Sequence, residues 1–286
     1  MDRGADGWIS GFVGMLIFSG SLPATRVAVA DFDPVFLTLA RAALAGLAAL
    51  LLLVAFRQRR PKRQDLPGLA VVAAGVVIAF PLLTALALRH VTAAHAVVFI
   101  GLLPLATAAF GVLRGGERPR PAFWIFSGLG SLLVAGFALS RGLDGDLLGD
   151  GLMLAAIVGC GLGYAEGAAL SRVYGGWQVI CWALVLSLPV TLAAALGTMP
   201  ASFDGVGVPA WIGLAYVSLF SMLIGFVFWY RGLARGGIAA VGQLQLLQPF
   251  FGLALAALLL GEAVGPATIL VAASVVLCVA GARRFA

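Results

Sequence analysis

Ten long apolar runs follow one another along the chain, and few charged residues interrupt them. They lie near residues 8–28, 34–56, 66–88, 91–113, 121–140, 150–172, 177–198, 209–231, 237–260 and 265–282. A helix needs about 20 predominantly apolar residues to cross a bilayer. Charged residues make up only 10% of the chain, against about 25% in a soluble domain, so a water-facing surface cannot be covered. We therefore predict an all-α integral membrane protein with ten transmembrane helices. Long runs without alternating polar residues exclude a barrel.

A group of glycine, proline and glutamate residues recurs after a shift of 145 positions. The matching residues, at identical internal spacing, are Pro104, Gly116, Glu117 and Pro121 in one half and Pro249, Gly261, Glu262 and Pro266 in the other. A period of half the chain indicates a duplicated module. We expect two five-helix repeats, 1–141 and 142–286. Because five is odd, the second repeat enters the membrane from the other side, and inverted repeats are typical of alternating-access carriers.

The basic residues gather in short loops that ten alternating spans would place on one side of the membrane. They are Arg57, Arg59, Arg60, Lys62, Arg63, Arg114, Arg118, Arg120, Arg283 and Arg284. Lys and Arg are in excess in cytoplasmic loops, so we predict that both termini are cytoplasmic. The net charge of +6 is thus assigned to orientation in a lipid bilayer and not to nucleic-acid binding. We expect the first run to be retained, because the repeat needs it as the counterpart of 150–172.

The repeated pattern resembles the EamA family of the drug/metabolite transporter superfamily. The residues that carry the resemblance are Pro104 with Gly116-Glu117 and Pro249 with Gly261-Glu262. The resemblance covers the whole chain and implies a ten-helix carrier of the bacterial inner (plasma) membrane that moves metabolites or xenobiotics outward through a central cavity. Within the family, the sequence is similar to bacterial exporters of aromatic amino acids.

The fourth and ninth runs carry polar residues that are costly to place in lipid, so each is a candidate substrate contact. His95 lies nine residues before Pro104, and helical periodicity places Phe99 on its face. The residue 145 positions after His95 is Ala240, whose face includes Gln243. An imidazole and an amide beside an aromatic ring would suit a zwitterion with an apolar or aromatic tail. Hydrogen bonding to a neighbouring helix is the alternative role of both polar residues.

The ninth run also holds Gln245, near the carbonyl that Pro249 is expected to free from its helical hydrogen bond. Such groups are acceptable at membrane depth where they face protein or a water-filled cavity. The remaining candidate substrate contacts, in the third, sixth and eighth runs, are Phe80, Thr84, Tyr164 and Trp229. Thr84 and Trp229 are themselves related by the 145-residue shift.

Two ionisable residues inside apolar runs have several possible roles. Glu166 could couple transport to protons, balance the charge of a substrate amine, or pair with Arg172 at the cytoplasmic end. Arg41 could bind a carboxylate, pair with Asp31 or Asp33, or extend to the interface.

Other residues have structural interpretations. Glu117 and Glu262 are expected to cap loops and not to bind substrate. Small residues that would allow close helix packing are Gly11 with Gly14, Gly159 with Gly163, and Gly128 with Ala135 and Gly136.

These observations predict a secondary exporter of small amphipathic metabolites, foremost aromatic or other apolar amino acids. A proton-driven extruder of cationic drugs has the same fold, and a carboxylate of Glu166 facing the cavity would favour it. The sequence has no nucleophile–base cluster, HExxH or filter motif, which disfavours a membrane-embedded lipid enzyme and a passive channel. It also has no P-loop, so direct ATP drive is excluded.

No cofactor or metal is expected, because two histidines and three cysteines without ligand spacing are poor material for a metal site. The expected mechanism is rocking of the two repeats about a central cavity. The third, fourth, eighth and ninth runs would line the cavity, and the first and sixth would contribute. Since one chain supplies both halves, a monomer would suffice.

Overall fold

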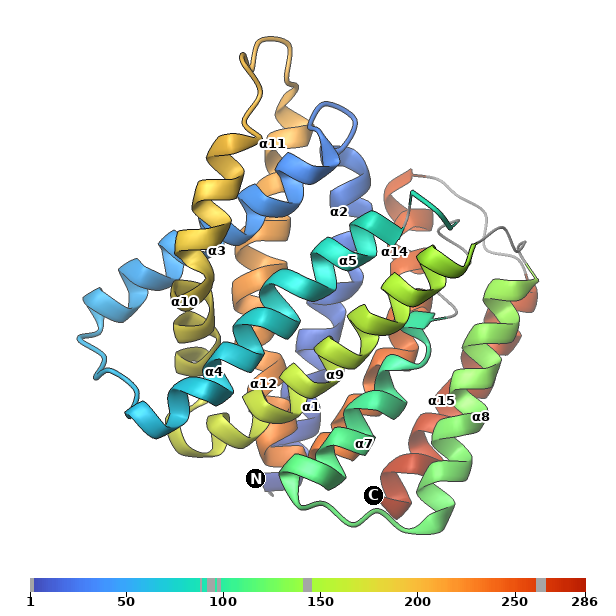
Figure 1. The fold of residues 1–286 in the computed structure, drawn as a ribbon. Coiled ribbons are helices and arrows are strands. Elements are labelled where there is room, and N and C mark those ends of the chain that lie inside the picture. Colours follow the sequence, from blue (N-terminus) through green and yellow to red (C-terminus); the bar gives the residue numbers. More distant parts are fainter. Residues whose placement is uncertain (1–2, 88, 92–95, 97–98, 141–145, 261–265) are drawn as a thin grey trace.

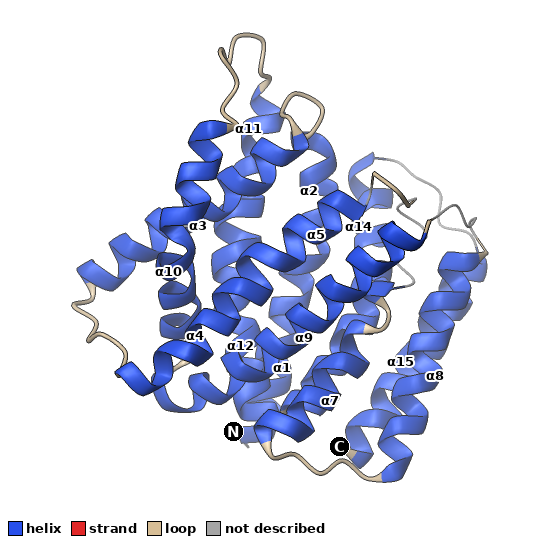
Figure 2. Ribbon diagram, in the orientation of Figure 1, coloured by secondary structure: helices blue, strands red, loops and turns tan. Residues whose placement is uncertain are grey.

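The computed structural model describes residues 3–87, 89–91, 96, 99–140, 146–260 and 266–286, and all regular structure in these residues is helical (Figures 1 and 2). The α-helices are α1 (Arg3–Ser19), α2 (Ser21–Ala28), α3 (Pro34–Ala55), α4 (Leu66–Val72), α5 (Phe80–Ala87), α7 (Leu103–Gly115), α8 (Pro121–Leu139), α9 (Leu147–Tyr174), α10 (Gly176–Gly197), α11 (Val208–Ala215), α12 (Gly225–Gly236), α13 (Ile238–Gly242), α14 (Gln248–Leu260) and α15 (Pro266–Phe285). Two π-helical segments, η2 (Ala73–Ala79) and η3 (Tyr216–Ile224), and two 3₁₀ segments, η1 (Arg63–Asp65) and η4 (Gln243–Leu247), join some of them.

Several of these helices are able to span a membrane. Within the described ranges, eight continuous helical stretches are long and apolar enough to do so, and two shorter apolar helices, Leu103–Gly115 and Pro121–Phe137, accompany them. The predicted all-helical fold is therefore confirmed and is consistent with a membrane protein, whereas the count of ten transmembrane helices stays a prediction. The expected run 91–113 is described only in part, and His95, Gly261 and Glu262 lie outside the described residues.

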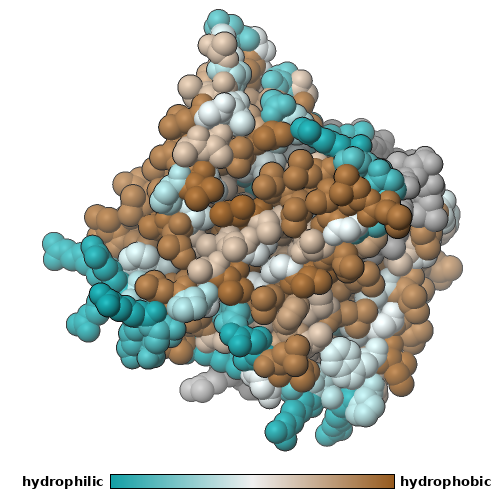
Figure 3. All heavy atoms as spheres, in the orientation of Figure 1, coloured by the Kyte–Doolittle hydropathy of each residue, from teal (hydrophilic) through white to brown (hydrophobic). Residues whose placement is uncertain are grey.

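The helices pack in pairs that join distant parts of the chain. The first helix, α1, lies along α12, α3 lies along α10, and α7 lies along α9. The segment α4–η2–α5 also packs on α9. The pair α8 and α15 stands at one edge of the molecule (Figure 1). Brown, apolar side chains cover most of the middle of the visible surface, and teal, polar ones lie toward its margins (Figure 3), as lipid-facing helices require.

Helix boundaries in the two halves follow the 145-residue shift. The helix starts related in this way are Phe80 and Gly225 (225 − 80 = 145), Leu103 and Gln248 (248 − 103 = 145), and Pro121 and Pro266 (266 − 121 = 145). Proline at the first or second position of a helix costs no internal hydrogen bond and has a suitable φ, which explains why two of these pairs of starts coincide with the repeated prolines Pro104/Pro249 and Pro121/Pro266.

Each half also contains a π-helical segment at a related position. Adding 145 to the bounds of η2 gives 218–224, which falls inside η3. Pro81, which has no backbone N–H, lies just after η2, whereas Phe226 stands at the related position after η3. A proline therefore does not explain both segments. Short π-helical stretches are rare and occur often at functional sites.

Some of the glycines that were predicted to allow close helix packing do so, and others do not. A Cβ on Gly232 would lie 2.6 Å from the Cα of Gly11, so α1 and α12 can approach this closely only because residue 232 is glycine. A Cβ on Gly11 would instead overlap Val241. Gly159 likewise lies against Gly75. The prediction is wrong for Gly128 and Gly136, because an added Cβ would meet no atom within 4 Å at either position.

One face of the molecule, here called the terminus face, carries both ends of the described chain and the α7–α8, α9–α10 and α12–α13 connections (Figure 1). The backbone N–H of Arg120 donates to the carbonyl of Phe285 over 2.9 Å, which ties the α7–α8 loop to the last helix. On the opposite face, the N–H of Gly207 donates to Asp31 over 2.8 Å and joins the loops before α11 and after α2. The expected breaks at 89–91 and 232–237 are present, and Gly237 allows the second with a φ of +93°.

Candidate functional site

Tyr164, Gln245 and Trp229 form a buried cluster in the middle of the molecule, as the prediction of a shared site requires. The Nε2 of Gln245, in η4, donates a hydrogen bond to the hydroxyl of Tyr164, in α9, over 3.1 Å. The rings of Tyr164 and Trp229 lie 5.6 Å apart at 61°. Trp229 belongs to α12 and is fully buried. Three helices that are distant in sequence thus bring two polar side chains and an aromatic ring together.

Aromatic residues that sequence reasoning did not select surround this cluster. Phe226 lies 6.1 Å from Tyr164, and Phe18 lies 6.0 Å from Trp229, measured between ring centroids. The ring of Tyr230 is 6.5 Å from that of Tyr164, and its hydroxyl donates to the carbonyl of Gly163 over 3.3 Å. Phe226 and Tyr230 could have been selected from the sequence, because residues 226–230 are rich in aromatic side chains. Phe18 had none, because a single phenylalanine in an apolar run is unremarkable.

Five of the predicted site residues have a buried polar atom without a hydrogen-bond partner in the described part of the chain. The atoms are Trp229 Nε1, Gln243 Oε1, Gln245 Oε1, Thr84 Oγ1 and Arg41 Nε. Buried polar atoms are nearly always paired, and each unpaired one costs about 1–3 kcal/mol. Such atoms are therefore expected where a ligand or water completes the hydrogen bonds. Three further atoms of this kind, in Ser127, Ser131 and Gln178, lie outside the predicted set.

The helix that carries the two glutamines changes its geometry where they occur. The segment Gln243–Leu247 is 3₁₀-helical and separates α13 from α14. The Nε2 of Gln243 lies 3.5 Å from the carbonyl of Ala239. The prediction of a freed carbonyl near Gln245 is wrong, because the N–H of Gln248 donates to it. The tighter 3₁₀ pattern bonds residue i to i+3, so it satisfies the carbonyl that Pro249 would otherwise leave open.

Glu166 has a different partner from the predicted one. Its carboxylate binds the Nε of Arg114, at the end of α7. Arg172 pairs with Glu117 instead, over 3.4 Å. Pairing with Arg172, which lies in the same apolar run, was one of three roles that the sequence left open for Glu166, and the structure does not show it. The sequence could not reveal that α7 packs on α9 and brings Arg114 closer.

Glu117 caps a helix across the boundary between the two halves. Its two oxygens accept the backbone N–H groups of Ile238 and Ala239 over 2.6 and 2.7 Å. These are the first residues of α13, whose amino terminus has no side-chain cap of its own. The expectation that Glu117 acts as a cap is therefore confirmed. Glu262 lies outside the described residues.

Arg41 lies two turns into α3 and is half-buried. The described residues show no ion pair or hydrogen bond for its side chain, because Asp33 caps α3 and Asp31 binds Gly207. Arg41 therefore pairs with neither Asp31 nor Asp33, the two predicted partners.

Phe80 and Phe99 pack on the same hydrophobic cluster that contains Tyr164 and Trp229. The structure shows no direct contact that joins Thr84 or Gln243 to Tyr164.

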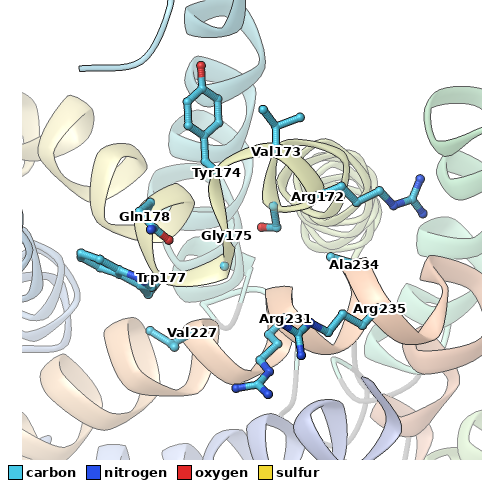
Figure 4. A pocket seen from close by; sticks show the side chains of 12 residues that line it. Arg172, Val173, Tyr174, Gly175, Trp177, Gln178, Val227, Arg231, Ala234 and Arg235 are labelled. Carbon is cyan, nitrogen blue, oxygen red and sulfur yellow. The ribbon is translucent and has the colours of Figure 1, made fainter. Parts of the chain in front are cut away.

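A separate cavity lies away from this cluster. It has a volume of about 890 Å³, opens on the terminus face and contains none of the predicted site residues (Figure 4). We assign the candidate substrate site to the central cluster because two of the unpaired polar atoms, Gln245 Oε1 and Trp229 Nε1, lie there beside aromatic rings. Among the described residues, no group of three or more His, Cys, Asp or Glu could hold a metal ion.

Sequence comparison places this architecture among transporters. A family model described as the EamA-like transporter family matches the chain twice, at residues 6–139 and 147–283. An uncharacterized transporter named YdeK from Bacillus subtilis (strain 168) is 70% identical over 286 residues, which is the full length of both chains. A probable terminal-alkyne amino-acid exporter from Streptantibioticus cattleyicolor is 27% identical over 252 residues, covering 88% of this chain and 84% of that protein.

A solved structure has the same fold. It is described only as the crystal structure of a protein, and it superimposes with a TM-score of 0.84 over 100% of both chains at 20% sequence identity. At this identity the likeness establishes the fold and nothing about the substrate.

Proposed function

The chain belongs to the EamA-like transporter family, and we propose that it exports amino acids with aromatic or apolar side chains. Family and relatives make it a multi-pass membrane transporter and not an enzyme. The amino-acid substrate is supported by the distant exporter relative and, more directly, by the chemistry of the central cluster.

The observation that carries the proposal is the set of unpaired polar atoms. The side-chain oxygens of Gln243 and Gln245 accept hydrogen bonds, so they match the ammonium group of an amino acid. The indole N–H of Trp229 and the guanidinium of Arg41 only donate, so they match its carboxylate. Within the central cluster, Gln245 Oε1 is such an acceptor and Trp229 Nε1 such a donor, and a zwitterion would bind both. Phe99 and the predicted but undescribed His95 would lie on the neighbouring span.

The aromatic side chains around the cluster support the apolar part of the substrate. Phe18, Phe226 and Tyr164 surround Trp229 and offer ring edges and faces, which stack well against an aromatic substrate. Glu166 is already engaged by Arg114. A proton-driven extruder of cationic drugs would instead need an acidic residue that is free to bind the cation. The site thus favours amino acids over cationic drugs.

For transport we propose ten spans arranged as two inverted repeats, 1–141 and 142–286, that rock about the central cluster. The related helix starts and the two-fold match of the family model support the duplication. On the terminus face, contacts cross between the halves: Glu117 caps α13, and Asp6 pairs with Arg231 over 3.0 Å and with Arg235. Opening toward this face must break them. The cations there favour a cytoplasmic location for both termini.

Counterflow in liposomes tests the proposal. Liposomes that contain the purified chain are loaded with unlabelled phenylalanine and then diluted into labelled phenylalanine, with and without a pH gradient. Transient accumulation of label without a gradient is expected of an amino-acid carrier. Absence of accumulation, together with pH-driven movement of a lipophilic cation, would identify a drug extruder instead.

A further inference from the structure

The cavity on the terminus face lies between the turn that joins α9 to α10 and the last turns of α12. Arg172 extends from α9 on one side, and Arg231 and Arg235 extend from α12 on the other (Figure 4). Its volume is about 890 Å³, which is large for an unused gap between packed helices. The proposed transport does not account for this cavity.

The charge of the cavity wall is positive. Three guanidinium groups face two carboxylates, those of Asp6 and Glu117. Asp6 is shared by Arg231 and Arg235, and Glu117 binds the amino terminus of α13 with both oxygens in addition to Arg172. Two carboxylates cannot neutralise three guanidinium groups, so the cavity wall keeps a net positive charge. Some of the guanidinium N–H groups also remain free to donate hydrogen bonds. Arginine forks match the oxygens of a phosphate group in geometry and charge.

A basic loop is fixed beside the same cavity. The hydroxyl of Tyr174, which lines the cavity, accepts the N–H of Lys62 over 3.1 Å and binds the carboxylate of Asp65 over 2.5 Å. These bonds hold the α3–α4 connection against the end of α9. The further cations that this connection carries are Arg57, Arg59, Arg60 and Arg63.

Apolar and amphipathic side chains at the rim indicate contact with lipid. Trp177 lines the cavity and packs edge-on against Phe56 at 5.7 Å, and Phe56 is 63% exposed. Val173, also at the rim, is 73% exposed. Tryptophan is enriched where the membrane meets water. An exposed phenylalanine and valine beside a charged cavity provide a surface for acyl chains next to a site for a headgroup.

We propose that this cavity binds the phosphate headgroup of an anionic phospholipid in the leaflet that faces the terminus face. Arg172 and Arg231 bind the phosphate oxygens from the two sides of the cavity, and the acyl chains lie along Val173 and Phe56. Basic pockets between transmembrane helices are known to select anionic headgroups. The site is separate from the central cluster, so the proposal holds whichever substrate is transported.

Native mass spectrometry of the purified full chain tests the proposal. The probes are phosphatidylglycerol, which is anionic, and phosphatidylcholine with the same acyl chains, which is not. Phosphatidylglycerol should be retained preferentially, and the Arg172→Gln/Arg231→Gln variant should bind it about thirty-fold more weakly. This variant leaves Asp6 paired with Arg235 and Glu117 bound to α13, so the helix contacts on this face are preserved.

The matched control is Arg120→Gln/Arg284→Gln, which removes two exposed arginines on the same face but outside the cavity. It should bind phosphatidylglycerol as the native chain does. Equal retention of the two lipids, or equal losses in the two double variants, would overturn the proposal. Displacement of the lipid by soluble glycerol phosphate at matched concentration would also overturn it, since the site would then select a free phosphate.

Discussion

The amide Nε2 of Gln245 donates to the hydroxyl of Tyr164 over 3.1 Å, with both side chains almost completely buried. This bond joins the 3₁₀ break in one span to the middle of another, beside Trp229, whose Nε1 has no partner among the described residues. A bond of this kind orients the glutamine, so that its Oε1, which has no partner among the described residues, is held in a defined direction. The fixed acceptor is the basis for expecting that a substrate ammonium binds there.

Replacing Gln245 by leucine should weaken phenylalanine binding. The change removes an acceptor from the substrate and leaves the hydroxyl of Tyr164 without its donor. A lost hydrogen bond to a charged group costs about 1.5–3 kcal/mol, so we expect the half-saturating concentration in counterflow to rise by about ten- to a hundredfold. The matched control is Gln178→Leu, a half-buried glutamine outside the cluster. Equal effects of the two substitutions would contradict the assignment.

Gly167→Ala should destabilise the fold, because the new Cβ would overlap the ring of Tyr230. Both positions are fully packed, and overpacking costs about 1–3 kcal/mol. The thermal unfolding temperature of the purified protein should therefore fall. Gly128→Ala makes the same chemical change in a helix where an added Cβ meets nothing within 4 Å. It should leave the unfolding temperature unchanged or raise it slightly, and a fall equal to that of Gly167→Ala would refute the packing.

Glu117→Ala should loosen the terminus face. Removing the cap leaves two backbone N–H groups at the start of α13 without an acceptor, at a cost of about 0.5–2 kcal/mol. The comparison variant is Arg172→Gln, which removes only the ion pair of 3.4 Å and keeps the cap. Arg172 is partly exposed, so this pair contributes about 0–1 kcal/mol. Unfolding temperatures should drop more for Glu117→Ala; the reverse order would show that the ion pair dominates.

The cap of α9 should depend on pH. The backbone N–H of Gly149 donates to Asp146 over 2.8 Å and lowers the pKa of this carboxyl below its usual value, and His90 at 3.1 Å adds to the shift. A carboxyl with a lowered folded-state pKa stabilises the fold above its ordinary pKa, and this contribution is lost as the pH falls through the folded value. The native chain should thus lose stability relative to Asp146→Asn below about pH 4. Parallel unfolding curves from neutral to acidic pH would contradict this.

Glu166→Gln should retain the same response to a pH gradient as the native chain. The carboxylate is bound to Arg114 at the terminus-face end of α9, so it has a structural partner and no need to carry a proton during transport. Uptake of labelled phenylalanine would be measured with and without a pH gradient in both proteins. If the gradient stimulates only the native chain, Glu166 is a coupling group and the structural assignment is wrong.

Much of the fold was predictable from the sequence because the bilayer restricts the choices. Apolar run length predicted the position of most helices, and the glycines at 236 and 237 marked the break between α12 and α13. The π-helical segments η2 and η3 were not predictable. They pack on helices that are distant in sequence, η2 on α9 and α10 and η3 on α3, and only one of them is followed by a proline.

The sequence predicted which residues belong to the candidate site better than it predicted how they contact one another. The cost of polar groups in lipid singled out Tyr164, Gln245 and Trp229, and the structure brings these three together. The partner of Glu166 was wrong, because neighbours in sequence are not the nearest neighbours between packed helices. Arg114 was assigned to a loop, and its reach across to α9 depends on the close packing of α7.

The most direct test of the amino-acid site is the intrinsic fluorescence of the purified chain during titration with phenylalanine. The native protein has six tryptophans, and only Trp229 belongs to the central cluster. We predict a saturable fluorescence change that Trp229→Phe abolishes and that Trp211→Phe, at a partly exposed position near the opposite face, retains. No saturable change in the native protein, or the same change in both variants, would contradict an amino-acid site at Trp229.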